Sequence, residues 1–177
     1  RADKRGAHQL LGVLKTVIDP DDLAYAIGVA LSNPDPSVRL EGLSNIPTRD
    51  LERYQRLLVD SLSDGSKMVR SKAIHLVARI RKTIIAEQIQ LRIDAPEFGD
   101  FEVDEKRRFY AACALTGGEP RRWFEQLNSN KLLATKGQEA ERHCAAIALG
   151  ISLARDARSL LEQESTRRLQ APLVTEG

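Results

Sequence analysis

The apolar positions of this chain recur with a helical period, in a phrase that is repeated along the sequence. Gly42, Leu43 and Ile46 follow Arg39 at three, four and seven positions, which places them on one stripe of an α-helix. No stretch of the chain shows a sustained alternation of apolar and polar residues, so the sequence predicts an all-α fold. The same helical frame starts again at three further arginines: Arg70, Arg108 and Arg142.

The spacing of these arginines indicates helix pairs. They lie 31, 38 and 34 positions apart, and each interval fits two short helices and two turns. An amphipathic segment precedes each of these second helices, and a last one, over 155–168, has no partner after it. A helix over about 6–18 would be the second member of a truncated first pair. The first helices of the other pairs are expected over 22–32, 50–63, 82–92 and 119–128.

Capping residues mark the expected starts of the second helices. Asp35 is followed by Pro36, which combines an N-cap side chain with a proline in the first helical turn. Ser66 and Asp104 occupy the same position before the next two arginines. Gln138 stands there in the fourth unit, so that helix is expected to begin less sharply. At the other end of a helix, the glycine pair at 117–118 predicts a left-handed cap.

The repeated phrases resemble a known family. LSNPDPSVRLEGLSNI (31–46) and LSDGSKMVRSKAIHLVARI (62–80) resemble HEAT repeats, in which a polar turn, a Val-Arg pair and a small residue lead into the second helix. EKRRFYAACALTGGEPRRWFEQL (105–127) and EAERHCAAIALGISLARDARSLLEQ (139–163) resemble the more divergent repeats of bacterial HEAT-repeat proteins. The resemblance spans about residues 22–165.

This resemblance implies an α-α superhelix of about five stacked antiparallel helix pairs. We expect one such array over 1–168, cut from a longer chain, and a frayed tail over 169–177. In the family, an acidic turn residue and an arginine of successive units form a ladder between neighbouring pairs. The resemblance therefore implies a structural role in such a ladder for Arg39, Arg70, Arg108 and Arg142, with Asp35, Asp64 and Asp104 beside the first three.

The third unit contains additional chain, the segment IDAPEFGDFEV over 93–103. Insertions in repeat arrays are placed in loops along one edge, and this edge is often used for binding. Phe98 and Phe101 within the segment have two interpretations: they cap the core between repeats, or they are offered to a partner. Capping is favoured, because burying an aromatic side chain contributes about 1.5–3 kcal/mol.

Composition and charge leave the class of partner open. Charged residues make up 29% of the chain and the formal net charge is +2, which neither demands nucleic acid nor indicates an acidic disordered tail. The longest apolar runs, such as LAYAIGVAL over 23–31, are shorter than the roughly 20 residues that cross a bilayer. The two cysteines lie inside apolar helical patterns, which favours buried thiols in a reducing compartment and hence a cytoplasmic protein.

One cluster of basic and aromatic residues suggests a second class of function. Basic residues interleaved with aromatic ones can bind phosphates and stack on bases. The alternative is a solvated helix face with Trp123 or Phe124 in the core, because nearby glutamates dilute the charge. The candidate patch for an anion or nucleic acid consists of Lys106, Arg107, Arg121, Arg122 and Trp123.

Catalytic and metal-binding patterns are weak. His143 and Cys144 are adjacent, so on a helix they point about 100° apart and cannot both face one ion. Nothing supplies a third group to orient a Cys-His pair, and no Gly-rich phosphate loop is present. DNA glycosylases and phycobilin lyases also use HEAT-like repeats, but the signatures that their chemistry needs cannot be assigned here. We therefore expect neither an enzyme nor a bound cofactor or metal.

The sequence thus favours a non-enzymatic scaffold or regulatory module that presents an extended helical surface to another protein. Nucleic-acid binding is the alternative. The outward positions of the second helices and the two loop phenylalanines are the candidate protein contacts: Glu41, Asn45, Lys72, His75, Arg79, Phe98 and Phe101.

Overall fold

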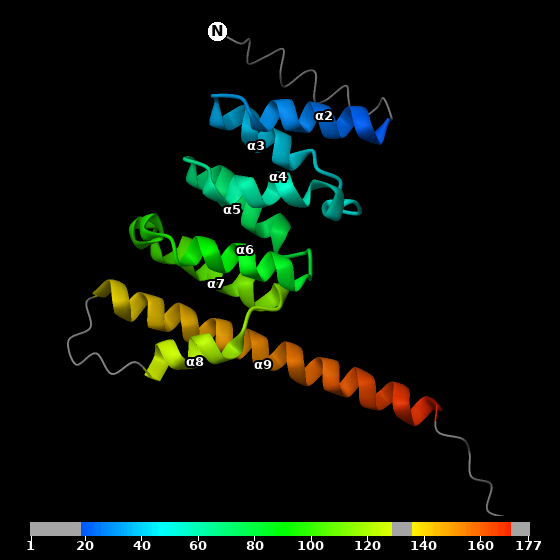
Figure 1. Ribbon diagram of the computed structural model, residues 1–177, viewed down its shortest axis with the longest axis vertical. Coiled ribbons are helices and arrows are strands. Elements are labelled where there is room, and N and C mark those ends of the chain that lie inside the picture. The colour runs from blue at the N-terminus through cyan, green and yellow to red at the C-terminus, as the bar shows by residue number, and fades with distance from the viewer. Residues whose placement is uncertain (1–18, 129–135, 171–177) are drawn as a thin grey trace, which may run out of the picture.

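The computed structural model describes residues 19–128 and 136–170, and within these ranges every regular element is helical. This confirms the all-α prediction. Figure 1 shows the helices as pairs that follow one another along the long axis of the molecule in chain order. The pairs are α2 (Pro20–Leu31) with α3 (Pro36–Ser44), α4 (Gln55–Asp60) with α5 (Lys67–Val77), α6 (Thr83–Ile93) with α7 (Val103–Thr116), and α8 (Pro120–Asn128) with α9 (Lys136–Gln170). The helix expected over 6–18 and the chain beyond residue 170 lie outside the described residues.

Polar side chains cap the first two described helices. Asp19 precedes α2 and its side chain accepts a hydrogen bond from the Asp21 amide at 2.8 Å. Asp35 caps α3 in the same way, accepting from the Ser37 amide at 2.9 Å, and Pro36 is the first helical residue. The helix start predicted from Asp35 and Pro36 is therefore confirmed.

The start of α7 differs from the prediction. The helix begins at Val103 with Glu102 as its N-cap, and the Glu102 side chain makes no capping hydrogen bond. Asp104, the predicted cap, lies in the first turn together with Glu105. Carboxylates are favourable there, because they face the positive end of the helix dipole. An acidic residue in the first turn was thus mistaken for the cap.

The segment expected as one helix over 50–63 changes helical type along its length. The 3₁₀-helices η1 (Leu51–Tyr54) and η2 (Ser61–Ser63) flank α4. Leu51, Tyr54, Leu58 and Leu62 are nevertheless all buried. Their spacing of three and four positions keeps one side of the segment towards the core through these changes.

The C-terminal helix α9 is longer than the sequence suggests. Two helices were expected, one beginning near Gln138 and one over 155–168, whereas α9 is continuous over 35 residues. The segment between them contains no proline, and the single Gly150 is tolerated within the helix. At 155, where a separate helix was expected to begin, the Arg155 guanidinium donates to the Ala114 carbonyl of α7 at 2.7 Å.

One continuous core runs through the pairs. Ile27, Leu43, Leu58, Phe109 and Trp123 belong to it and are almost fully buried. The insertion between α6 and α7 forms a third 3₁₀-helix, η3 (Pro96–Asp100), which adds its own aromatic side chain to the core. Each pair therefore depends on its neighbours to cover its apolar side.

Two glycines are needed here for different reasons, one for a close helix contact and one for a helix end. At Gly42, a Cβ atom would lie 3.1 Å from the Cβ of Ala30, so the small residue lets α3 approach α2. Gly117 ends α7 in the left-handed conformation, with φ of 112°, as the glycine pair predicts.

Candidate functional site

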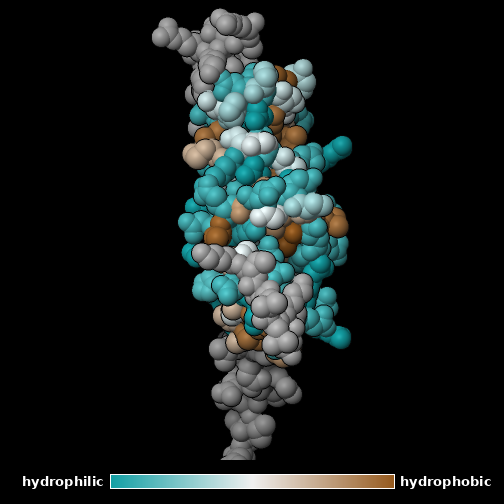
Figure 2. All heavy atoms as spheres, turned by 90° about the vertical axis from the view of Figure 1, so that its left-hand side faces the viewer, coloured by the Kyte–Doolittle hydropathy of each residue, from teal (hydrophilic) through white to brown (hydrophobic). Residues whose placement is uncertain are grey.

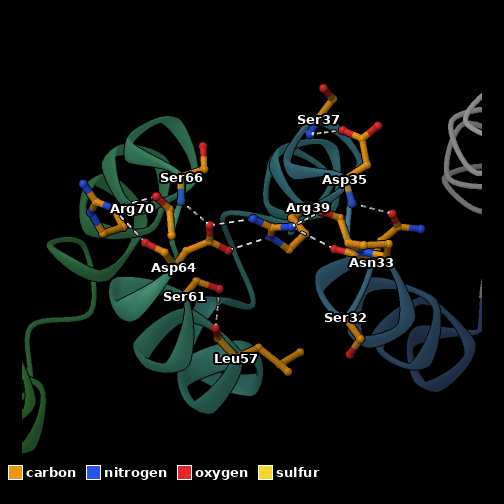
Figure 3. A network of polar contacts seen from close by, with 12 residues as sticks. Ser32, Asn33, Asp35, Ser37, Arg39, Leu57, Ser61, Asp64, Ser66 and Arg70 are labelled. Carbon is orange, nitrogen blue, oxygen red and sulfur yellow. Dashed lines mark hydrogen bonds and ion pairs between the residues drawn. The ribbon is translucent and has the colours of Figure 1, made fainter.

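A ladder of charged contacts joins successive helix pairs, and its first rung is drawn in Figure 3. Arg39 of α3 donates from Nε and Nη2 to the two carboxylate oxygens of Asp64, at 2.6 and 2.8 Å. Its Nη1 donates to the carbonyls of Asn33 and Pro34, both at 2.9 Å. One side chain thus closes the turn of its own pair and binds the turn of the next pair.

The second rung repeats this arrangement. Arg70 of α5 forms a bidentate pair with Glu105 of α7, at 2.6 and 2.9 Å. Its Nη1 donates to the carbonyls of Asp64 and Gly65 (Figure 3 shows the first of these contacts). The side chains of Arg70 and Glu105 are only 11% and 3% exposed. The guanidinium also lies over the Phe101 ring, 4.2 Å from its centroid.

Lys106, and not Arg108, provides the third rung. Its ammonium group contacts Glu141 of α9 at 3.2 Å and the Gly99 carbonyl at 2.8 Å, and the side chain is buried. Arg108 is exposed and donates to the Ser71 hydroxyl, and Arg142 is exposed and donates to the Leu127 carbonyl at 3.0 Å. The expected ladder roles of Arg108 and Arg142 are therefore wrong.

The correction follows from counting along each helix. Arg39 and Arg70 are the fourth residues after their N-caps, Asp35 and Ser66. The fourth residue after Glu102, the N-cap of α7, is Lys106. The ladder therefore comprises Arg39 with Asp64, Arg70 with Glu105, and Lys106 with Glu141.

The electrostatics of the ladder favour fixed geometry. Burial raises the pKa of Asp64, but hydrogen bonds from Arg39 and the Ser66 amide and the charges of Arg39 and Arg70 outweigh burial, so its pKa is lowered. Desolvation offsets much of the attraction in such pairs, whereas removing one partner leaves a charge without its counterpart. The ladder therefore holds the register between pairs more than it adds to stability.

One side of the molecule has a mainly polar surface. Figure 2 looks onto the side that lies on the left in Figure 1, and hydrophobic residues there form small separate spots among hydrophilic ones.

An apolar groove lies across α3, α5 and α7, which contact one another in that order. Its volume is about 510 Å³. Met68 is 64% exposed at its edge, and Leu115 is 39% exposed. We call this feature the second-helix groove. It is lined by Leu40, Met68, Ser71, Lys72, Ile74, His75, Ala78, Arg108, Ala111, Ala112 and Leu115.

Only some of the predicted protein-contact residues line the second-helix groove. Lys72 and His75 line the second-helix groove. Glu41 is half-buried and Arg79 is exposed beyond the end of α5, and neither lines the groove. Asn45 is buried, 4% exposed, and its amide donates to the carbonyl and the carboxylate of Glu41, so its expected outward position is wrong. Sequence reasoning missed Met68, Leu115 and Arg108 as groove residues.

The two loop phenylalanines pack inward. Phe98 is 2% exposed and its ring centroid lies 5.2 Å from Phe101, 5.5 Å from Phe109 and 6.3 Å from Tyr110. Phe101 is half-buried between this cluster and Arg70. The geometry agrees with the capping interpretation and leaves Phe98 out of reach of a partner.

The candidate anion patch does not form an open basic surface. Arg107 contacts Asp104 at 3.4 Å, Arg121 contacts Glu125 at 2.9 Å and Arg122 contacts Asp94 at 2.6 Å. The two remaining members are buried, Lys106 in the ladder and Trp123 in the core. Lys106 and Trp123 are therefore not accessible to phosphates and bases, and this part of the expectation is wrong. Each of the four basic residues of the patch faces a carboxylate.

A second cavity of about 680 Å³ lies between α6, the end of α7 and α8. Cys113 lies in its wall, and the thiol contacts the Ala86 carbonyl at 3.5 Å. Burial raises the pKa of Cys113 to about 12, and burial also raises the pKa of Cys144. Both thiols are therefore protonated at neutral pH, and a protonated thiol is a poor nucleophile.

Comparison with known proteins assigns no relative. No family model matches the chain, and no curated protein and no solved structure matches it significantly. Within the described residues, no helix combines the length and apolar character needed to cross a membrane. In the same part of the chain, no three His, Cys, Asp or Glu side chains are grouped so that they could hold a metal ion.

Proposed function

We propose that this chain is a non-enzymatic, cytoplasmic protein-interaction module built as a HEAT-like superhelix. The order of the helix pairs in Figure 1 and the repeated ladder contacts support this architecture. In such arrays each pair is stabilised by its neighbours, and the stack of second helices forms an extended surface. The module would act by presenting this surface to another protein.

The second-helix groove is the observation that carries the proposal. Apolar side chains from three different helix pairs meet in it and remain open to solvent. Exposed apolar clusters of this kind mark interaction sites, since a chain gains nothing in solution from leaving them uncovered. The protonated thiols of Cys113 and Cys144 support a non-enzymatic role, because neither is activated as a nucleophile.

Nucleic-acid binding, the alternative class, receives less support. Phosphate binding depends on basic side chains that are free to replace counterions. The pairing of Arg107, Arg121 and Arg122 with carboxylates reduces this attraction, and burial of Trp123 removes the expected stacking surface.

Photo-crosslinking tests the proposed surface. A photoreactive phenylalanine analogue replaces Met68 in the chain expressed in its own cells, and captured proteins are identified by mass spectrometry. Leu91 on α6 is the matched control position, because it is also 64% exposed and lies outside the groove. We expect a defined partner to be captured from position 68 and not from position 91. Capture from neither position, or equally from both, would contradict the proposal.

A further inference from the structure

We infer that the second-helix groove binds an amphipathic helix of another protein, with acidic residues along the flanks of its apolar face. This inference rests on the proposed function and specifies the chemistry of its partner. Three features of the groove carry it: the shape of its floor, the exposed apolar side chains at its edges and the charge of its rim.

The floor of the groove fits side chains and not a whole helix. Ile74 and Ala112 are buried beneath it, while Ala78 and Ala111 are small residues that leave space above them. A helix with its side chains is about 10–12 Å wide, so a groove of about 510 Å³ admits only the side chains of one helical face. Amphipathic helices bind in this way through apolar anchors at positions i, i+3 or i+4, and i+7.

Exposed apolar side chains of the groove lining add contact surface. Met68 of α5 and Leu115 of α7 are substantially exposed there. Methionine is flexible and polarizable, so it can adapt to the side chains of a bound helix. A nucleic acid has no aliphatic side chains with which to fill such a floor, which favours a protein as the occupant.

The rim is positively charged. Lys72 and Arg108 line the groove, and no carboxylate contacts either side chain in the described part of the chain. No aspartate or glutamate stands between Asp64 and Glu87, a stretch that includes all of α5. Charge complementarity therefore selects a partner with carboxylates beside its apolar anchors.

Nearby carboxylates of this chain are already engaged. In the first turn of α7, Glu105 pairs with Arg70 and Asp104 with Arg107. On α3, Glu41 accepts a hydrogen bond from Asn45. Among the described residues, Arg108 donates to the Ser71 hydroxyl and not to a carboxylate, so the carboxylates that pair with Lys72 and Arg108 would come from the partner.

Defined peptides test the inference on the full chain. The first probe is a fluorescent 18-residue peptide with leucines at i, i+3, i+4 and i+7 and glutamates on both flanks, about five helical turns in length. The second has lysines in place of the glutamates, and the third has the composition of the first in scrambled order. Fluorescence anisotropy measures the dissociation constants. We expect the glutamate peptide to bind about tenfold more tightly than either of the others.

Substitutions in the chain locate the binding. Met68→Glu should weaken binding of the glutamate peptide about tenfold, whereas Leu91→Glu, at an equally exposed position outside the groove, should not change it. Lys72→Glu should weaken the glutamate peptide and strengthen the lysine peptide, because it reverses the charge of the rim. Circular dichroism checks that each variant remains folded. Such a reversal cannot result from loss of folding.

Three outcomes would overturn the inference: no binding of the glutamate peptide up to about 1 mM, equal binding of all three peptides, or equal effects of Met68→Glu and Leu91→Glu. Self-association of the chain that Met68→Glu abolishes would identify a second copy as the occupant and would also overturn it. If crosslinking from position 68 captures a protein while the glutamate peptide fails, the proposed function stands and only the acidic helix is rejected.

Discussion

At the scale of single residues, the ladder assigns two tasks to one basic side chain per pair. Arg39 and Arg70 each bind the carbonyls of their own turn and a carboxylate of the next pair. The repeated phrases within the sequence predicted these two residues, because both are arginines four positions after a cap. It missed Lys106 because the residue type changed and because the added η3 segment moved the start of the next helix.

Removing the acid of the first rung should destabilise the protein. We expect Asp64→Asn to lower the free energy of unfolding by about 3 kcal/mol at neutral pH, because Arg39 would lose its charged partner. Urea unfolding measures this change. Asp60→Asn is the control, since Asp60 is exposed at the end of α4, and its effect should lie within about 0.5 kcal/mol.

The same pair predicts a pH dependence. The pKa of Asp64 is lowered in the folded protein, so its contribution is fully present above the ordinary carboxyl pKa of about 4 and is lost as the pH falls through the lower folded value. Asp64→Asn should therefore show a smaller loss of stability on acidification than the unmodified chain. An identical acid dependence of the two proteins would show that this rung contributes nothing.

At the scale of elements, the bounds of a helix could be predicted from the sequence where capping residues mark its ends. The start of α3 was predicted correctly because Asp35 and Pro36 satisfy its first turn. The start of α7 was missed, since Glu102 makes no side-chain capping bond and leaves no signal. The continuity of α9 was missed because an amphipathic stripe records which face packs and does not show whether the backbone continues.

A proline substitution tests the continuity of α9. Ala154 is exposed in the middle of this helix, and Ala154→Pro should cost about 3 kcal/mol or more because proline removes a backbone donor and clashes with the preceding turn. Ala154→Gly, the milder control, should cost about 1 kcal/mol. Urea unfolding compares the variants. A harmless proline at 154 would indicate that a separate helix begins at 155.

The η3 segment is expected to stabilise the molecule through one side chain. Phe98→Ala should reduce the free energy of unfolding by about 3–5 kcal/mol, because it empties a site enclosed by Phe101, Phe109 and Tyr110. Phe124→Ala removes a ring that is 57% exposed and should cost less than about 1 kcal/mol. Thermal unfolding of the two variants checks the difference, and equal midpoints would mean that η3 merely fills the connection.

At the scale of the whole molecule, the continuous core was predictable but the second-helix groove was not. Apolar periodicity gives the buried face of each helix, and it correctly placed Lys72 on an outward face. The position of Arg108 and Leu115 opposite Lys72 depends on how α7 is rotated against α5. That rotation depends on how the side chains of the two helices pack together, which the sequence does not show.

The two cysteines report on opening of the whole molecule. Cys113 and Cys144 are both fully buried, so neither should react with a thiol reagent until the protein unfolds. Reaction with Ellman's reagent should therefore follow the urea unfolding curve. Raising the pH to about 9 should not release Cys113, whose pKa is about 12. Immediate labelling of either thiol in the native protein would contradict this core.

The charged contacts between pairs also have a direction. At every rung the base comes from the pair nearer the N-terminus and the acid from the pair that follows, from Arg39 with Asp64 to Lys106 with Glu141. Such head-to-tail contacts can be repeated, because each helix pair offers an acid to the preceding pair and a base to the following one. A middle unit lost or duplicated during evolution would therefore still leave complementary charges at the new junction.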